Sequence, residues 1–174
     1  MAFERVDSRM EWEGRIAKVR VDTVRFDDGE EAEREVVEHP GAVAIVAHDG
    51  ETLYLVRQPR EAVGEQALLE LPAGKLDEPG EDERATAERE LAEEIGKGAR
   101  TWEKLTSFYT TPGFADEEMH LYLATDLYDR EAETEENERI EVVEVPLERL
   151  DEAIEECADG KSLVGLLWFR AYLR

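Results

Sequence analysis

The segment Ala42–His48 restricts the fold of this chain more than any other part of the sequence. It reads AVAIVAH, so six apolar residues follow one another without the polar alternation of a half-exposed strand. Such a run predicts a strand that is buried on both faces. The pair Asp49-Gly50 then predicts a tight turn into a second apolar strand that ends near Gln58. We therefore expect a hairpin at the centre of a covered sheet.

The other expected elements follow in the order strands, one helix, more strands and two final helices. We expect strands in residues 14–26, 33–38, 68–74, 102–110, 119–125 and 138–145, and helices at Asp82–Ile95, Leu147–Ala158 and Leu163–Tyr172. Gly160 is expected to act as a helix stop. This order predicts an α/β (α+β) fold, in which a mixed sheet lies between helical layers.

The length and the hairpin signals together predict the domain organisation. A chain of 174 residues is long enough for one main domain, which we assign to residues 41–174. Before it, the turn pair Asp28-Gly29 joins two alternating stretches. We therefore expect an N-terminal β-hairpin unit in residues 1–40.

The net charge excludes several kinds of partner. Acidic residues number 45 and basic residues 21, which gives a formal net charge of −24 at pH 7. A chain this acidic repels nucleic acid and anionic membrane surfaces. The sequence contains no run of about 18 apolar residues that would cross a membrane, and its single cysteine, Cys157, suits a reducing compartment. We expect a cytoplasmic protein that binds neither nucleic acid nor membranes.

A group of carboxylates on the first predicted helix is the main candidate for a functional site. On a helical wheel of about 100° per residue they share one face, opposite the apolar residues of the same helix. They are Glu83, Glu90, Glu93 and Glu94. Carboxylates one turn apart repel each other by about 3 kcal/mol at an effective dielectric near 20, and a divalent cation would remove that cost. In a chain with 45 acidic residues, a merely solvated acidic face is the alternative interpretation.

The chemistry of this cluster indicates which metal it would bind. Its ligands are all oxygens, which suits a hard and strongly hydrated cation such as Mg²⁺. No pairing of cysteine and histidine offers a zinc site. We expect Mg²⁺, with Mn²⁺ as the alternative.

The residues around the helix follow a recognisable order. They are Gly74, Glu81, Arg89, Glu90, Leu91, Glu93, Glu94 and Gly96. This order closely resembles the signature of the Nudix hydrolases, in which a loop, a helix and a second loop carry these residue types at fixed spacings. One extra residue lies between Gly74 and Glu81, and Lys97 stands at a usually aliphatic position. Neither departure removes a carboxylate.

The resemblance implies a fold and a role for individual residues. The implied fold is the Nudix α/β/α sandwich with a mixed sheet. Glu90 and Glu94 would bind the metal with Glu93 beside them, and the carbonyl of Ala73 would complete the set. Arg89 would orient these carboxylates through a salt bridge. An ordinary ion pair within the helix is the alternative for Arg89.

Residues outside the signature resemble the ADP-ribose pyrophosphatase branch of this family. The matching stretches are RQPRE, ELPAGKLDEPGE and FYTTPGFADEEMHLYLA, and Pro112 lies 16 residues after Gly96, as the branch requires. The resemblance implies substrate contacts at Arg57, Arg60, Glu70, Pro112 and Gly113. A protein this acidic needs local cations for two phosphates, which the metal and the arginines would supply. Arg57 and Arg60 could equally be surface ion-pair partners.

The general base is expected on the acidic loop before the last predicted strand. In the ADP-ribose pyrophosphatase branch a glutamate of this loop often takes the proton of the attacking water. Glu138 is the first candidate here and Glu136 the second. A purely solvated position is the alternative for both.

Together these features predict metal-dependent hydrolysis of the diphosphate bond of ADP-ribose or a related nucleoside diphosphate sugar. The products would be AMP, or another nucleoside monophosphate, and a sugar phosphate. Two alternatives stay open, namely a catalytically silent module that binds nucleotide sugars and a housecleaning pyrophosphohydrolase of damaged nucleotides. Relatives of this branch commonly dimerise through an N-terminal strand unit, so residues 1–40 are expected to form the contact of a homodimer.

The balance of basic residues generates a prediction about salt. Only five of the 21 basic residues are lysines, which resembles proteins adapted to a high-salt cytoplasm. Because salt screens the repulsion within so acidic a chain, we expect molar KCl to raise the urea midpoint of unfolding. Urea titrations with and without KCl measure this. An unchanged midpoint would identify an acidic protein without salt adaptation.

Overall fold

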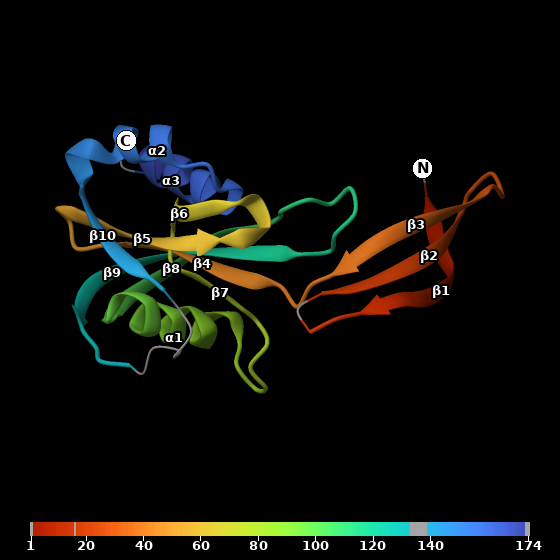
Figure 1. The fold of residues 1–174 in the computed structure, drawn as a ribbon, viewed down its shortest axis with the longest axis horizontal. Helices are drawn as coiled ribbons and strands as arrows, with labels where there is room; N and C mark the ends of the chain where they lie inside the picture. Colours follow the sequence, from red (N-terminus) through yellow and green to blue (C-terminus); the bar gives the residue numbers. More distant parts are fainter. Residues whose placement is uncertain (1, 16, 133–138, 173–174) are drawn as a thin grey trace. The chain divides into compact units, whose positions relative to one another are not determined.

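The computed structural model of the chain describes residues 2–15, 17–132 and 139–172. The chain divides into two compact units. The first comprises Met1–Gly41 and Tyr109–Glu118, and the second comprises Ala42–Phe108 and Met119–Arg174. Each unit is built on a sheet of its own (Figure 1).

The first unit is a three-stranded antiparallel sheet in the order β1-β2-β3. Its strands are β1 (Phe3–Glu13), β2 (Lys18–Phe26) and β3 (Glu31–Glu38). The expected hairpin is present as β2 and β3, and Gly29 makes its turn at a φ of 88°. Strand β1 was not expected. Its sequence FERVDSRMEWE is heavily charged and shows little alternation of apolar and polar residues. Two register shifts also interrupt its pairing with β2.

The second unit contains a mixed sheet of seven strands in the order β10-β5-β4-β9-β8, with β6 paired to β5 and β7 paired to β4. The strands are β4 (Ala42–His48), β5 (Thr52–Arg60), β6 (Glu65–Glu70), β7 (Ala73–Lys75), β8 (Lys97–Tyr109), β9 (Glu118–Asp129) and β10 (Glu141–Pro146). Strand β4 runs parallel to β9 and antiparallel to β5 and β7. It is buried along almost its whole length, as its apolar run predicts.

Helices cover both faces of this sheet, which confirms the predicted sandwich with a mixed sheet (Figure 1). Helix α1 (Glu83–Ile95) packs on one face, and helices α2 (Leu150–Glu156) and α3 (Gly160–Tyr172) pack on the other. Two short 3₁₀ turns, η1 (Glu61–Val63) and η2 (Leu147–Arg149), complete the second unit. No helix in these described stretches is long and apolar enough to cross a membrane.

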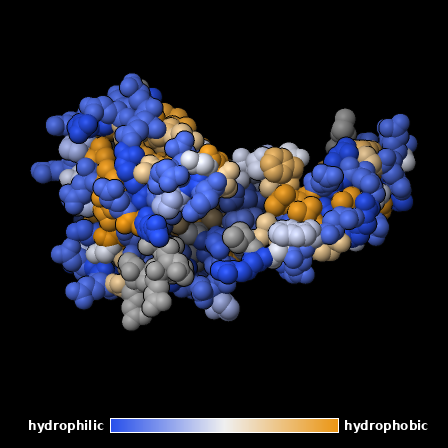
Figure 2. Space-filling model, in the orientation of Figure 1, coloured by the Kyte–Doolittle hydropathy of each residue, from blue (hydrophilic) through white to orange (hydrophobic). Residues whose placement is uncertain are grey.

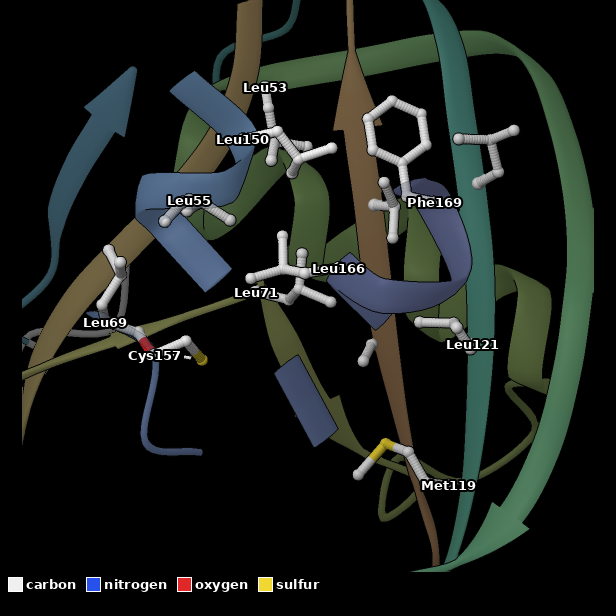
Figure 3. Close-up of a cluster of buried hydrophobic side chains, with 14 of the residues drawn as sticks. Leu53, Leu55, Leu69, Leu71, Met119, Leu121, Leu150, Cys157, Leu166 and Phe169 are labelled. Carbon is white, nitrogen blue, oxygen red and sulfur yellow. Dashed lines mark hydrogen bonds between the residues drawn. The ribbon is translucent and has the colours of Figure 1, made fainter. Parts of the chain in front are cut away.

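Alternate residues of β4 enter two separate hydrophobic cores. Val43 and Ile45 pack with Leu91 of α1, whereas Ala44 and Val46 face the side of α2 and α3. In this second core, Phe169 and Leu166 of α3 lie over the sheet near Leu71 and Leu121 (Figure 3). The β6–β7 connection is therefore packed directly beneath helix α3.

The ends of the last two helices differ from the expectation for Gly160. Helix α2 ends at Glu156, where Cys157 turns into an extended conformation, and Gly160 is the first residue of α3. Asp159 caps α3, because its carboxylate accepts a hydrogen bond from the backbone N–H of Ser162 at 3.0 Å. The expectation of a helix stop at Gly160 was wrong, since the capping aspartate beside it starts a helix.

The surface agrees with the charge of the sequence. On the face shown in Figure 2, hydrophilic residues cover most of each unit, and hydrophobic residues form only small patches. Several of the large exposed apolar side chains belong to β1, among them Phe3, Met10 and Trp12.

Candidate active site

Helix α1 places the acidic residues of the signature in its last two turns. The side chain of Asp82 caps its start by accepting from the N–H of Ala85 at 2.8 Å, and Gly96 ends it in the left-handed conformation. Leu91 and Ala92 are buried in the core beneath the sheet. The same helix carries Glu90, Glu93 and Glu94, and of these three Glu94 is buried as well.

Two of these carboxylates contact strand β7. The buried carboxylate of Glu94 accepts a hydrogen bond from the N–H of Ala73 at 3.1 Å. Glu90 packs so closely on Gly74 that a Cβ at that position would lie 1.9 Å from the Glu90 carboxyl carbon. Glycine at residue 74 thus leaves room for the carboxylate of Glu90, while its backbone angle is not unusual.

Arg89 joins three carboxylates of the signature. Its Nη1 donates to Glu90 Oε1 and to Glu93 Oε2, both at 2.8 Å, and its Nε donates to Glu81 Oε2 at 3.1 Å. Burial disfavours the charge of this guanidinium, but the surrounding carboxylates outweigh burial and raise the pKa of Arg89. Arg89 is therefore a permanent cation that offsets repulsion within the cluster.

The three glutamates carry the kind of donor atom that a hard divalent cation binds. Glu90, Glu93 and Glu94 offer only carboxylate oxygens, which Mg²⁺ and Mn²⁺ prefer. Among the residues that the structure describes, no group of three or more His, Cys, Asp and Glu side chains lies close enough together to hold a metal ion. Arg89 lies between Glu90 and Glu93 instead, so a bound cation would share these carboxylates with Arg89.

Glu83 does not join the acidic face that the helical wheel assigned to it. Its carboxylate binds the ammonium of Lys104 and accepts from the hydroxyl of Tyr122 at 3.2 Å. Lys104 first, and His120 after it, lower the pKa of Glu83. The wheel gives the angle of a side chain on an isolated helix, and it does not include Lys104 of β8 and Tyr122 of β9, which bind the carboxylate in the first turn.

Glu70 and Arg60 form a second charged group. The side chain of Glu70 is only 1% exposed, and Arg60 binds it with both nitrogens of its fork, at 2.6 Å from Nε and 2.8 Å from Nη2. Lys161 adds a third contact, at 2.5 Å from Nζ to Oε2. Burial alone would raise the pKa of this carboxyl, but Arg60 and Lys161 hold the pKa of Glu70 below its usual value.

The start of helix α3 extends this group with residues that the sequence analysis missed. Lys161 also donates to Asp159 at 2.7 Å, and the hydroxyl of Ser162 donates to the same carboxylate at 2.5 Å. In turn, Ser162 Oγ accepts from the N–H of Leu71 at 2.7 Å. An Asp three residues before a Ser and an apolar run is a helix-start signal that would have located this corner.

The connection between β6 and β7 is held from both faces of the sheet. Ser162 of α3 accepts from the N–H of Leu71, and Glu94 of α1 accepts from the N–H of Ala73. Between them, the carbonyl of Pro72 accepts from the N–H of Ile45 at 2.9 Å. Glu94 and the Glu70 group are therefore linked through four consecutive residues of backbone.

The other substrate-binding candidates lie in different surroundings. Arg57 of β5 forms an ion pair with Glu156 of α2 and donates to the carbonyl of Ala67 at 3.3 Å. Pro112 and Gly113 lie in the first unit, at an exposed turn. The candidate bases Glu136 and Glu138 fall outside the described residues.

The turn that contains Pro112 is fixed to the end of β3. The N–H of Val37 donates to the carbonyl of Phe114 at 2.8 Å, and Asp116 accepts from the N–H of His39 at 2.8 Å. Arg20 of β2 also binds Asp116, at 3.2 Å. Residues that are far apart in the sequence thus form one structural unit.

A cleft of about 440 Å³ opens beside the C-terminal end of α1. Its walls include Glu93 and Glu94 on the helix, and Ile140 and Val142 on the segment leading into and along β10. This volume is in the range of small-molecule sites, about 300–1,000 Å³. The acidic cluster therefore borders a space that could admit a ligand.

Comparison with known proteins identifies the family. A family model described as NUDIX domain matches residues 37–164. The chain is 40% identical over 162 residues to the ADP-ribose pyrophosphatase of Bacillus subtilis (strain 168), covering 90% of this chain and 86% of that protein. The chain belongs to the Nudix hydrolases, which generally use divalent metal ions.

Further relatives place the chain within the family. With the same coverage of 90% and 86%, it is 41% identical to a methanol dehydrogenase activator of Bacillus methanolicus. It is 48% identical over 126 residues to the ADP-ribose pyrophosphatase of Mycobacterium tuberculosis, covering 72% of this chain and 60% of that protein. A crystal structure of an ADP compounds hydrolase superposes with a TM-score of 0.87 at 26% identity, over 99% of this chain and 95% of that one. The protein is thus an ADP-ribose pyrophosphatase-like Nudix hydrolase, as its sequence predicts.

The close approach of Glu90 to Gly74 generates a prediction. In a Gly74→Ala variant the new methyl group would occupy the position of the Glu90 carboxylate, which must then move by more than 1 Å. Because displacements of that size cost about 100-fold in rate, we expect diphosphate hydrolysis to fall by about 100-fold. A Gly160→Ala variant is the control, since a Cβ there meets nothing within 4 Å. Full activity of Gly74→Ala, with an unchanged dependence on metal concentration, would contradict this role of Glu90.

Proposed function

We propose that this protein hydrolyses the diphosphate bond of ADP-ribose or a related nucleoside diphosphate sugar, and that it uses Mg²⁺. The observation that carries the proposal is the convergence of Glu90 and Glu94 on Ala73 and Gly74, with Arg89 bridging the carboxylates. Its support comes from the similarity to two proteins named ADP-ribose pyrophosphatase. The expected products are a nucleoside monophosphate, AMP for ADP-ribose, and a sugar phosphate.

In this proposal Glu90 and Glu94 hold the cation, with Glu93 beside them and the carbonyl of Ala73 as a further ligand. Mn²⁺ is the alternative metal. When bound, the cation would offset charge on the phosphates and lower the pKa of a coordinated water. Arg89 fixes the directions of Glu90 and Glu93 through its two 2.8 Å contacts, so that the carboxylates are oriented before the substrate arrives.

Arg60 is the strongest candidate for binding the substrate phosphates. Its side chain is 41% exposed, so the guanidinium can contact an anion while it is still paired with Glu70. Arg57, Pro112 and Gly113 stay proposed substrate contacts, and Glu70 acts through Arg60. Glu138, and after it Glu136, stay the proposed general base.

The test is turnover by the purified protein of a substrate panel with Mg²⁺ and then with EDTA. The panel contains ADP-ribose, ADP-glucose, GDP-mannose, dinucleoside polyphosphates and nucleoside triphosphates. We expect hydrolysis of nucleoside diphosphate sugars that EDTA abolishes. A preference for triphosphates would favour a housecleaning hydrolase. Binding of the sugars without any metal-dependent turnover would favour a silent binding module.

A substitution of one metal ligand sharpens this test. Glu94→Gln keeps the size of the side chain but removes a ligand charge, so we expect kcat to fall by about 100-fold or more. Glu88→Gln on the same helix is the matched control, because Glu88 pairs with Arg84 on the exposed side. Activity should be unchanged in the control. Turnover of Glu94→Gln at the wild-type rate would be incompatible with the proposed metal site.

We also propose that residues 1–40 form the contact of a homodimer. Strand β1 is an edge strand of its sheet, and Phe3 and Trp12 on it are 69% and 56% exposed. An edge strand with large apolar side chains is a template for pairing with another chain. A second copy of this chain would bury both the edge and the aromatic side chains.

The dimer predicts a mass in solution of twice the 19.9 kDa of one chain. Light scattering after gel filtration measures it, at a salt concentration that keeps the protein folded. We expect Trp12→Glu to shift the mass toward a monomer, since it places a charge within the contact. Leu167→Glu, on the exposed face of α3, is the control for a contact elsewhere. A monomeric wild type, or a monomer caused only by Leu167→Glu, would refute the proposed contact.

A further inference from the structure

The buried carboxylate of Glu70 has two cationic partners that differ in their freedom to move. Arg60 is 41% exposed, whereas Lys161 is 12% exposed and is held a second time by Asp159. Both bind the same nearly inaccessible carboxylate, on which Oε2 receives one contact from each. One partner can therefore leave toward solvent while the other is confined.

The charges of this group are balanced so that Arg60 can turn away from Glu70. Two carboxylates, Glu70 and Asp159, face two cations, Arg60 and Lys161. If Arg60 turned away, Glu70 would keep Lys161, and Asp159 would keep the N–H and hydroxyl of Ser162 at 3.0 Å and 2.5 Å. Without Lys161, the same movement would leave a buried carboxylate unpaired, a penalty of roughly 100-fold or more in an equilibrium constant.

Carboxylates on both sides of the β6–β7 connection favour the charge of Arg60. Glu70 first, and Glu94 among the weaker contributions, raise the pKa of Arg60. The geometry that connects the two groups is the backbone, because Glu70, which binds Arg60, lies three residues before Ala73, whose N–H donates to Glu94.

We propose that Lys161 is a positioning residue that makes Arg60 available to the substrate. Lys161 neutralises Glu70 when the guanidinium of Arg60 turns from Glu70 to the diphosphate of the bound nucleotide sugar. No bond forms or breaks in this step, since one ion pair is exchanged for another. The inference rests on the proposed function, in which Arg60 binds the phosphates, and it adds a residue of α3 to that site.

A purely structural role for Lys161, as an ion pair that links α3 to β6, makes different predictions. Loss of such a link lowers the free energy of unfolding by the same amount whether Arg60 is present or absent. It also leaves the KM for substrate unchanged in the protein that remains folded. Two measurements therefore separate the two roles.

The first measurement is steady-state kinetics of Lys161→Met with ADP-ribose and Mg²⁺. Without Lys161, Arg60 stays bound to Glu70, so we expect KM to rise about 10-fold while kcat changes by less than about threefold. Lys161→Arg should restore KM, because it restores the charge. Lys104→Met is the matched control, since Lys104 pairs with Glu83 at the start of α1. An unchanged KM in Lys161→Met would overturn the proposal.

The second measurement needs no activity. Thermal unfolding is compared for the wild type, Arg60→Met, Lys161→Met and the double variant. We expect the double variant to lose about 5 °C more in Tm than the two single losses together, because only there is Glu70 unpaired. Adding Glu70→Gln should remove this excess. If the double variant does not fold unless Glu70→Gln is added, this also supports the proposal, because the unpaired Glu70 is then the cause of the instability.

Additive losses, or an excess that persists with Glu70→Gln, would overturn the inference about Lys161. Failure of the proposed function is recognised separately, because the wild type would then hydrolyse no diphosphate at all. In that case the unfolding comparison still shows whether Lys161 neutralises Glu70 when Arg60 is absent.

Discussion

The hydrogen bonds to the backbone of residues 71–73 are the constraint on which the candidate site depends. This connection passes between two helical layers, where its N–H groups are removed from water and must find partners. Ser162 supplies one partner from α3 and Glu94 the other from α1. The same two contacts fix where Ala73 and Gly74 lie beneath the acidic helix. The position of the proposed metal ligands is therefore determined by packing on both faces of the sheet, and not by helix α1 alone.

Charge is distributed unevenly in this acidic molecule. Two cations near the site each contact more than one carboxylate: Arg89 contacts three, and Lys161 contacts two. A buried carboxylate costs stability unless it is paired, and the contact of Lys161 with the buried Glu70 offsets part of that cost. On the surface, hydrated acids repel one another in solvent, where the cost of each pair is small. Salt adaptation of that surface stays a prediction from the composition.

The sequence predicted the elements whose signals are local. The apolar run of β4, the limits of α1 and the spacing of the signature residues were sufficient for the sandwich and the family. Strand β1 was missed because its side chains are exposed and charged, so it has no buried face to create a pattern. Glu83 was assigned to the wrong group of carboxylates, and Lys161 was not recognised as part of the site, both for another reason. Their partners come from strands and helices distant in the chain, and a wheel or a motif contains no information about those contacts.

The pairing of the turn at 110–117 with the end of β3 has a consequence for the order of folding. The amides of Val37 and His39 find their partners about 77 residues later, at Phe114 and Asp116. Contacts of such sequence separation form slowly, since a long loop must close first. During synthesis the N-terminal sheet would thus leave the ribosome well before residues 110–117, with which the end of β3 pairs. For that interval β3 is a half-completed edge, and a neighbouring nascent chain could occupy it.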